Sequence, residues 1–138
     1  MYPIIVNTHD AVSTLMGKYV ITKTSDEGFK FNLIANNHEV IGTSQVFKSL
    51  QSAKDSCESV KNFCNSDIED QTLQNPEPKK CPKWEIYLDK AGEYRFRLLA
   101  SNGENLLASE GYTSKANAKN GIESVKKNCD SEIEVKEE

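Results

Sequence analysis

The chain has 138 residues, a formal net charge of −4 at neutral pH and a sequence pI near 5.3. This length fits one ordinary domain or two small ones, and the acidic balance argues against a surface that mainly binds phosphate. No apolar run approaches the ~20 residues that span a bilayer, and 1–16 lack the basic start and apolar centre of a secretory signal. We therefore expect a cytoplasmic protein.

Residues 1–16 form an N-terminal extension that stands apart from the rest of the chain. The apolar residues between Tyr2 and Val6 favour a short strand, and Ala11 to Met16 favour about one turn of helix. His9 lies in this extension, where we expect it to be exposed.

The remainder of the chain is a tandem duplication. Residues 17–71 align with 82–136 without a gap, and nineteen of the fifty-five positions are identical. The linker at 72–81 is polar and contains Pro76 and Pro78, which discourage regular structure. The sequence therefore predicts a first repeat at 17–71 and a second at 82–136.

Each repeat is expected to contain three strands, a helix and a short closing strand. The predicted strands lie at 19–24, 29–36, 40–46 and 67–70 in the first repeat, and at 84–89, 93–101, 105–111 and 132–136 in the second. The predicted helices lie at 50–64 and 115–128. A unit of about 55 residues with one helix buries little surface. We therefore expect the two units to form a single α+β domain, with one shared sheet and both helices on one face.

The second repeat carries the clearest local signals. Asn102-Gly103 predicts a two-residue hairpin turn, and Ser114 predicts the helix N-cap. Apolar residues recur along the helix with a spacing that forms one buried stripe. Gly121 interrupts this helix, which indicates a close approach to the sheet. The core is expected to contain Phe31, Leu33, Val60, Phe96, Leu98, Ala118, Ile122 and Val125.

Four segments of the second repeat resemble the YegP-like family, small bacterial and archaeal proteins built on a domain of unknown function. These segments are Gly92 to Leu98, Ser101 to Glu104, Ser109 to Lys115 and Asn120 to Lys126. The resemblance implies a pseudo-dimer of two β3αβ units in one antiparallel sheet, with the C-terminal strands exchanged between units. It brings no established activity.

The first repeat departs from the family pattern at three positions. His38 stands where the second repeat has the turn glycine, Gln45 replaces Glu110, and Ser56 replaces Gly121. A function that depends on both copies of these residues is therefore doubtful.

The sequence offers little support for catalysis. His9 and His38 are the available histidine bases, and we interpret His38 as a turn residue. No nucleophile elbow, phosphate-binding glycine loop, zinc-protease helix or calcium loop occurs. The acidic pairs on the closing strands, Asp67 with Glu69 and Glu132 with Glu134, are expected to form solvated faces. We expect no enzymatic activity, no cofactor and no catalytic residues.

The cysteines do not form a metal-binding pattern, because no Cys-x-x-Cys pair occurs. We expect reduced thiols and no metal site, with Cys57 as a small buried core residue. Cys64 and Cys129 end the two helices at equivalent positions, so a structural zinc site or a disulfide between them is a minor alternative.

The open face of the sheet is the predicted binding surface. If Phe31 and Phe96 face the helices, the opposite face carries Tyr87, Arg95, Arg97 and Lys30. Arginine and aromatic side chains on an open sheet can stack nucleic-acid bases. Only two arginines occur in this acidic chain, so a nucleic-acid partner is not expected.

The leading functional hypothesis is a non-enzymatic binding or interaction module that uses this open face to bind a protein or small molecule. The alternative is a small enzyme or ligand sensor with a site at the seam between the repeats. The tandem repeat replaces a dimer, so we expect a monomer.

Overall fold

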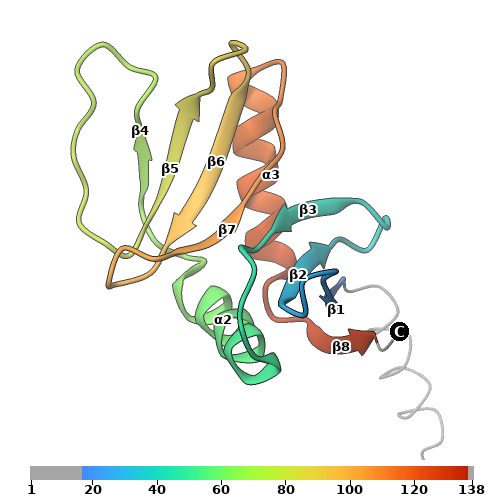
Figure 1. Cartoon of the computed structure of the whole chain (residues 1–138). Helices are drawn as coiled ribbons and strands as arrows, with labels where there is room; N and C mark the ends of the chain where they lie inside the picture. The colour runs from blue at the N-terminus through green and yellow to red at the C-terminus, as the bar shows by residue number, and fades with distance from the viewer. Residues whose placement is uncertain (1–16, 137–138) are drawn as a thin grey trace, which may run out of the picture.

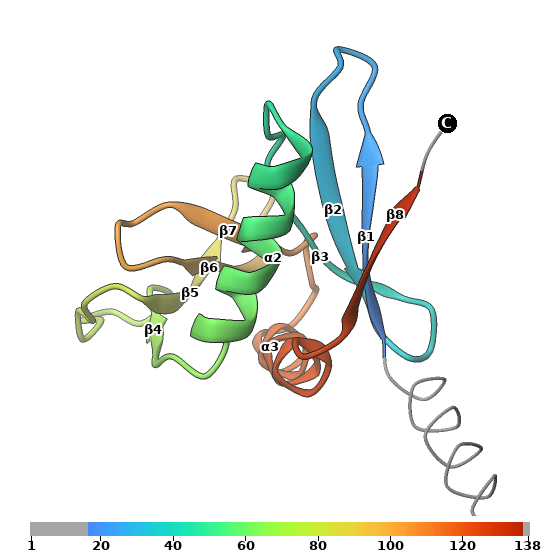
Figure 2. The same cartoon turned by 90° about the horizontal axis from the view of Figure 1, so that it is seen from below.

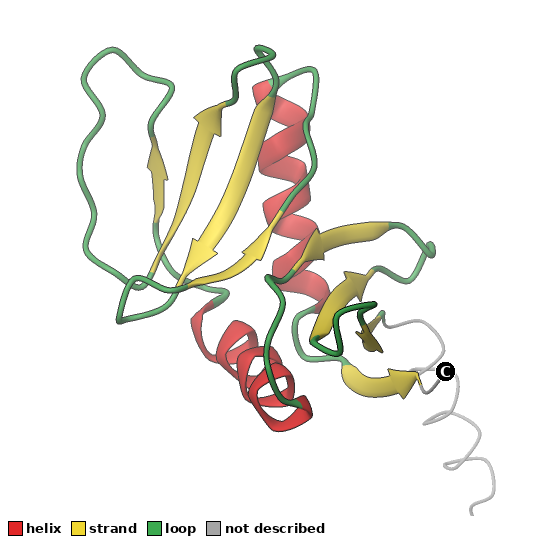
Figure 3. Ribbon diagram, in the orientation of Figure 1, coloured by secondary structure: helices red, strands yellow, loops and turns green. Residues whose placement is uncertain are grey.

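The computed structural model describes residues 17–136, so the predicted elements in 1–16 and His9 lie outside the described residues. The described elements, in chain order, are β1 (Lys18–Lys23), β2 (Phe29–Ile34), β3 (Val40–Thr43), α2 (Leu50–Phe63), β4 (Ile68–Asp70), β5 (Lys83–Leu88), β6 (Tyr94–Leu99), β7 (Asn105–Ala108), α3 (Lys115–Asn128) and β8 (Glu132–Lys136). The predicted order of elements in each repeat is confirmed, although β3 and β7 end earlier than expected. The loop that joins β4 to β5 contains no helix or strand (Figure 3).

All eight strands join one sheet in the order β4-β5-β6-β7-β3-β2-β1-β8, so equivalent strands follow the same order from either edge (Figure 1). β4 of the first repeat pairs with β5 of the second, and β8 pairs with β1, which confirms the exchange of closing strands. The sheet is mostly antiparallel as expected, but the exchanged strands at both edges run parallel to their neighbours. Neither parallel pair is joined by a tight hairpin, which would require antiparallel strands, because a long loop joins β4 to β5 and nearly the whole described chain separates β1 from β8.

The two halves of the sheet meet where β3 passes β7. Thr43 and Ala108 are the paired residues between these strands, and the two halves run in clearly different directions from this junction (Figure 2). Gly42 and Leu107 hold equivalent positions beside it. A Cβ atom added to Gly42 would lie 2.5 Å from Cγ of Leu107. One leucine therefore packs against one glycine, so the junction is not symmetric in its side chains.

Both helices cover the sheet face that carries the alternating apolar residues of the strands. The eight residues predicted for the core are all 0% exposed, and all of them except Ala118 belong to one cluster that spans both repeats. A β-bulge in the pairing of β6 with β7 allows the consecutive residues Leu106 and Leu107 to be buried together.

Each helix begins at a serine that caps its first turn. The hydroxyl of Ser49 accepts a hydrogen bond from the backbone N–H of Ser52 at 3.0 Å, and Ser114 accepts one from Asn117 at 3.1 Å. The predicted N-cap at Ser114 is therefore confirmed. Each bond satisfies a backbone donor that has no partner within its helix.

The predicted two-residue turn at Asn102-Gly103 is wrong. The N–H of Gly103 donates to the carbonyl of Ala100, the N–H of Ala100 donates to the carbonyl of Glu104, and Gly103 has a φ of 84° while Asn102 has no positive φ. This is a three-residue loop, in which a type I turn is followed by a left-handed residue. His38 holds the equivalent position with a φ of 72°, which confirms it as a turn residue.

Cys64 and Cys129 form a disulfide with Cα atoms 6.8 Å apart, so the expectation of reduced thiols is wrong for this pair. Both cysteines follow the last residue of a helix at equivalent positions, and the arrangement of the repeats brings these helix ends together. Beside the disulfide, each repeat donates one hydrogen bond to a cysteine carbonyl of the other repeat. Tyr19 donates to the carbonyl of Cys129 at 2.6 Å, and the indole of Trp84 donates to the carbonyl of Cys64 at 2.8 Å. Cys57 is fully buried as predicted, and burial raises the pKa of its thiol to about 12.

Candidate functional site

The predicted binding face is divided between the two halves of the sheet. Tyr87 and Arg95 are opposite each other on β5 and β6, and the guanidinium carbon of Arg97 lies 4.3 Å from the centre of the Tyr87 ring. Lys30 lies on β2, three strand positions away from β6. The structure therefore brings together three of the four predicted residues.

Carboxylates neutralise the cations at the centre of this face. Nε of Arg97 lies 2.6 Å from Oε1 of Glu85, and Nζ of Lys83 lies 3.0 Å from Oε2 of Glu85 and 2.7 Å from Oε1 of Glu69. Burial alone would raise the pKa of Glu85, but hydrogen bonds donated by Lys83 and Arg97 bring that pKa below its ordinary value. Arg97 is therefore held in an ion-pair network of the protein itself.

Glu69 connects this network to the linker. Its carboxylate accepts hydrogen bonds from the side chains of Gln71 and Lys83 and from the backbone N–H of Lys79, each at 2.7 Å. These bonds, with the Gln71 bond contributing most, lower the pKa of Glu69 to about 2. The linker is thereby attached at the edge of the predicted binding face.

Arg95 is also paired within the protein. Its Nε lies 2.7 Å from Oδ2 of Asp89, and this bond lowers the pKa of Asp89 and raises that of Arg95. An anionic ligand on this face would have to displace carboxylates from both arginines, which weakens the hypothesis that the open face is the binding surface.

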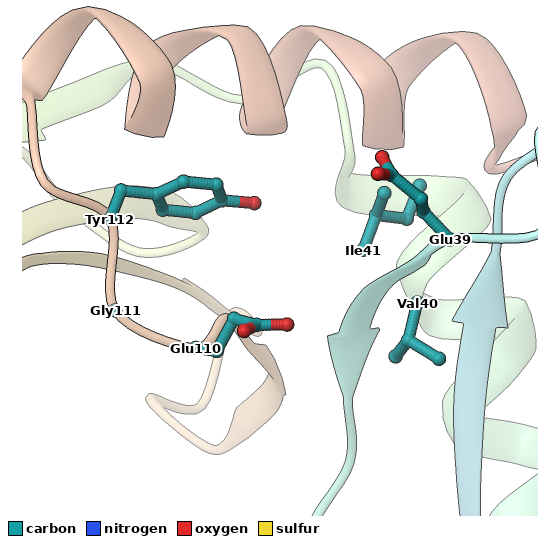
Figure 4. Close-up of a pocket in the computed structure, with 6 residues that line it drawn as sticks. All are labelled: Glu39, Val40, Ile41, Glu110, Gly111 and Tyr112. Carbon is teal, nitrogen blue, oxygen red and sulfur yellow. The ribbon is translucent and has the colours of Figure 1, made fainter.

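A surface cavity of about 300 Å³ lies at the seam between the repeats, where β3 and the segment after β7 separate beyond Thr43 and Ala108. It is lined by Glu39, Val40, Ile41, Glu110, Gly111 and Tyr112. In Figure 4 the Tyr112 hydroxyl and the Glu110 carboxylate point across the cavity towards β3, from which Glu39 and Ile41 face them. We name this space the seam cavity.

Local backbone geometry fixes the two carboxylates of the seam cavity. The side chain of Asn37 accepts a hydrogen bond from the backbone N–H of Glu39 at 3.0 Å, as in an Asx turn. The hydroxyl of Ser109 accepts from the backbone N–H of Phe96 at 2.9 Å and donates to the carbonyl of Glu110 at 2.8 Å. The hydrogen bonds of Asn37 and Ser109 therefore fix the backbone beside the two glutamates.

Tyr112 is fixed by its backbone and by its ring. It exchanges two backbone hydrogen bonds with Tyr94, each at 2.8 Å, and its ring stacks on Phe96 with centroids 6.1 Å apart. A Cβ atom added to Gly121 would lie 2.7 Å from the Tyr112 hydroxyl, which confirms that this glycine permits a close approach. Burial raises the pKa of Tyr112, and the charges of Glu110 and Glu39 raise it further.

The Tyr112 hydroxyl also lacks an internal partner. The Tyr19 hydroxyl donates to a buried carbonyl, whereas the Tyr112 hydroxyl has no hydrogen-bond partner within residues 17–136. Within the same range, neither Glu39 nor Glu110 forms an ion pair. The Glu39 carboxylate accepts a hydrogen bond from the side chain of Asn37 at 3.2 Å, so within this range the Glu110 carboxylate and the Tyr112 hydroxyl are the groups left without a partner.

On the other side of the Thr43–Ala108 pair, the equivalent seam is bridged by a hydrogen bond between two side chains, and we name it the closed seam. Here Gln45 replaces Glu110 and Glu104 replaces Glu39, and Nε2 of Gln45 donates to Oε2 of Glu104 at 3.0 Å. Ser44 anchors this strand as Ser109 anchors its counterpart, with bonds of 2.9 and 2.7 Å. A hollow of about 250 Å³ remains beside this pair, lined by Phe47, Ser52, Asp55, Ser56, Ser59 and Glu104.

The sequence did not predict the seam cavity as the leading site. It singled out Gln45 and Ser56 as departures from the repeat pattern, and both are among the positions at which the two seams differ. The pairing of β3 with β7 was needed to show that Glu39 and Glu110 line one cavity. Among residues 17–136, no group of three or more His, Cys, Asp or Glu residues could hold a metal ion.

The comparisons with known proteins agree with this fold. The sequence matches the domain of unknown function DUF1508 twice, at 25–68 and 89–134, and the chain therefore belongs to that family. No helix within 17–136 is long and apolar enough to cross a membrane.

Related proteins match this chain either over most of its length or over a single stretch of repeat size. A UPF0339 protein of Pseudomonas aeruginosa is 33% identical over 113 residues, which cover 82% of this chain and 90% of that protein. A UPF0339 protein of Agrobacterium fabrum is 65% identical over 46 residues, which cover 33% of this chain and 74% of that one.

Two solution NMR structures resemble the fold. That of yegP from E. coli, a protein of unknown function, has a TM-score of 0.72 and 27% identity, covering 88% of this chain and 93% of its own. That of a UPF0339 protein from Shewanella oneidensis has a TM-score of 0.70 and 29% identity, with coverages of 86% and 90%. The YegP-like resemblance and the α+β fold are thereby confirmed.

Proposed function

We propose that this protein is a non-enzymatic binding module and that the seam cavity is its binding site. The observation that carries the proposal is the convergence of Glu39, Glu110 and the Tyr112 hydroxyl on one cavity. Among the described residues, neither carboxylate has an ion-pair partner, and the single side-chain hydrogen bond to them comes from Asn37. Ligand sites combine an apolar lining with a few convergent polar groups, and about 300 Å³ lies at the lower end of their volumes. A small molecule or a single side chain fits this size.

The open face is a weaker candidate for the same function. Arg95 and Arg97 already pair with Asp89 and Glu85, so binding there would replace existing ion pairs. The seam cavity offers its carboxylates without that competition.

An enzyme at the same seam is the second candidate, because two carboxylates across a cavity can act as acid and base. We prefer the binding module because the lining contains no serine, cysteine, lysine or histidine, so any nucleophile would have to be a carboxylate or Tyr112. The expectation of a monomer stays a prediction.

Amide chemical shifts of the ¹⁵N-labelled protein, recorded during titration with a fragment library of cationic, neutral and anionic compounds, test the location of the site. We expect shifts that cluster at 39–41 and 110–112. Shifts confined to Tyr87, Arg95 and Arg97 would instead assign binding to the open face. Release of a chemically altered fragment would favour the enzyme.

A further inference from the structure

The two seams differ in their charge while sharing their backbone. At the closed seam, Gln45 supplies an amide N–H to the carboxylate of Glu104. At the seam cavity, the residue in the place of Gln45 is Glu110, so two carboxylates line the space and neither can donate to the other. The Gln45 donor is thus absent here, and the side chain of Asn37 supplies a single hydrogen bond to Glu39.

The chemistry of the seam cavity defines what could replace that donor. Two carboxylates present four acceptor oxygens, and the Tyr112 oxygen can accept a further hydrogen bond. None of the six lining residues carries a positive charge. A ligand that meets these groups therefore needs several N–H donors and a positive charge of its own.

The remaining walls define the rest of the ligand. Ile41 is 6% exposed and Val40 is 42% exposed, and the Tyr112 ring forms another wall. Apolar side chains accept an aliphatic segment, and an aromatic ring attracts a cation. These walls suit a charged head on a short hydrocarbon chain.

We propose that the seam cavity binds an organic cation, an ammonium or guanidinium group at the end of a short aliphatic chain, held between Glu39 and Glu110 with the Tyr112 hydroxyl beside it. This inference rests on the proposed function and names its ligand class. The same chemistry occurs in a free amine and in an arginine side chain of a peptide.

Calorimetric and NMR titrations of the full chain with agmatine, and separately with the peptide Gly-Arg-Gly, distinguish these sources. We expect both probes to shift the amides of 39–41 and 110–112. Tighter binding of agmatine assigns a free amine, and tighter binding of the peptide assigns an arginine side chain. The neutral probe butylurea, which keeps the donors and loses the charge, is expected to bind at least about tenfold more weakly than agmatine.

Two matched variants exchange the chemistry of the seams. Glu110→Gln copies the closed seam and should weaken agmatine binding at least about tenfold. Gln45→Glu copies the open seam and should produce agmatine-dependent shifts around Gln45 and Glu104. We expect the second site to be weaker, because Phe47 replaces Tyr112 and has no hydroxyl. Circular dichroism of both variants checks that the fold is retained.

Equal agmatine binding by the wild-type protein and Glu110→Gln would overturn the inference. If a neutral or anionic fragment binds the seam cavity while agmatine and Gly-Arg-Gly do not, the proposed function stands and the cationic ligand class is wrong. If no fragment shifts 39–41 or 110–112, both proposals are wrong.

Discussion

The two seams of this molecule combine the same backbone anchors with different side chains. Ser44 and Ser109 are identical and anchor the two strands in the same way. The residues that follow them, Gln45 and Glu110, give one seam an internal hydrogen bond and the other two facing carboxylates. The shared positions maintain the backbone, and the divergent positions leave one seam open to a ligand.

The exchange of closing strands makes the two repeats depend on each other, and its removal should have the largest effect. Deletion of 131–138 removes β8, the parallel neighbour of β1. Because short strands need a paired neighbour, the first repeat should loosen together with the second. Hydrogen exchange is expected to show lost protection at 29–35 as well as at 94–100. Loosening confined to the second repeat would contradict this account.

The disulfide should contribute the next largest effect. Cys64 and Cys129 are 65 residues apart, and closing a loop of that length stabilises a fold by about 4 kcal/mol in the chain-entropy description. Urea unfolding with and without dithiothreitol should show a loss of that order. Cys81→Ser is the matched control, because Cys81 is a free cysteine, and it should keep the full response. Equal stability under both conditions would show that the bond adds nothing.

The cores of the two repeats differ at one helix position, where Ile122 corresponds to Cys57. Both residues are fully buried. Ile122→Ala should lower the free energy of unfolding by about 2–5 kcal/mol, and Cys57→Ala should cost less because it removes fewer atoms. Chemical denaturation measures both. A larger loss for Cys57→Ala would reverse the comparison.

The helices also differ where they approach the aromatic residues of the seams. Gly121 faces Tyr112, whereas Ser56 and Phe47 hold the equivalent positions. Gly121→Ser should cost about 1–3 kcal/mol by overpacking. Adding Tyr112→Phe, which restores the pair of the first repeat, should recover part of that loss in a double-mutant cycle. Strictly additive losses would show that the two positions do not interact.

Sequence patterns predicted most of this fold because strands, helices and their caps depend on local spacing. The alternation of apolar and polar residues predicted that Phe96 and Leu98 are buried, and Ser114 predicted the start of α3. The prediction of a two-residue turn at Asn102-Gly103 was wrong because Asn-Gly also suits a three-residue loop with one left-handed residue.

The features that the sequence did not predict depend on contacts between repeats. The Cys64–Cys129 bond forms only because the ends of the two helices lie close together, which local spacing does not predict. The position of the seam cavity depends in the same way on the register between β3 and β7. The predicted binding face had the right side chains for a site. Its ion pairs, such as Arg97 with Glu85, became apparent only from strand register.

The central claim is that Gln45 gives one seam an internal hydrogen bond that Glu110 cannot form in the other, and stability in the absence of any ligand tests it most directly. Urea denaturation of Glu110→Gln and Gln45→Glu exchanges the two arrangements. Glu110→Gln should raise the free energy of unfolding by up to about 1 kcal/mol, because an amide hydrogen bond replaces two facing carboxylates. Gln45→Glu should lower it by a similar amount. A loss of stability in Glu110→Gln, or no loss in Gln45→Glu, would contradict the account.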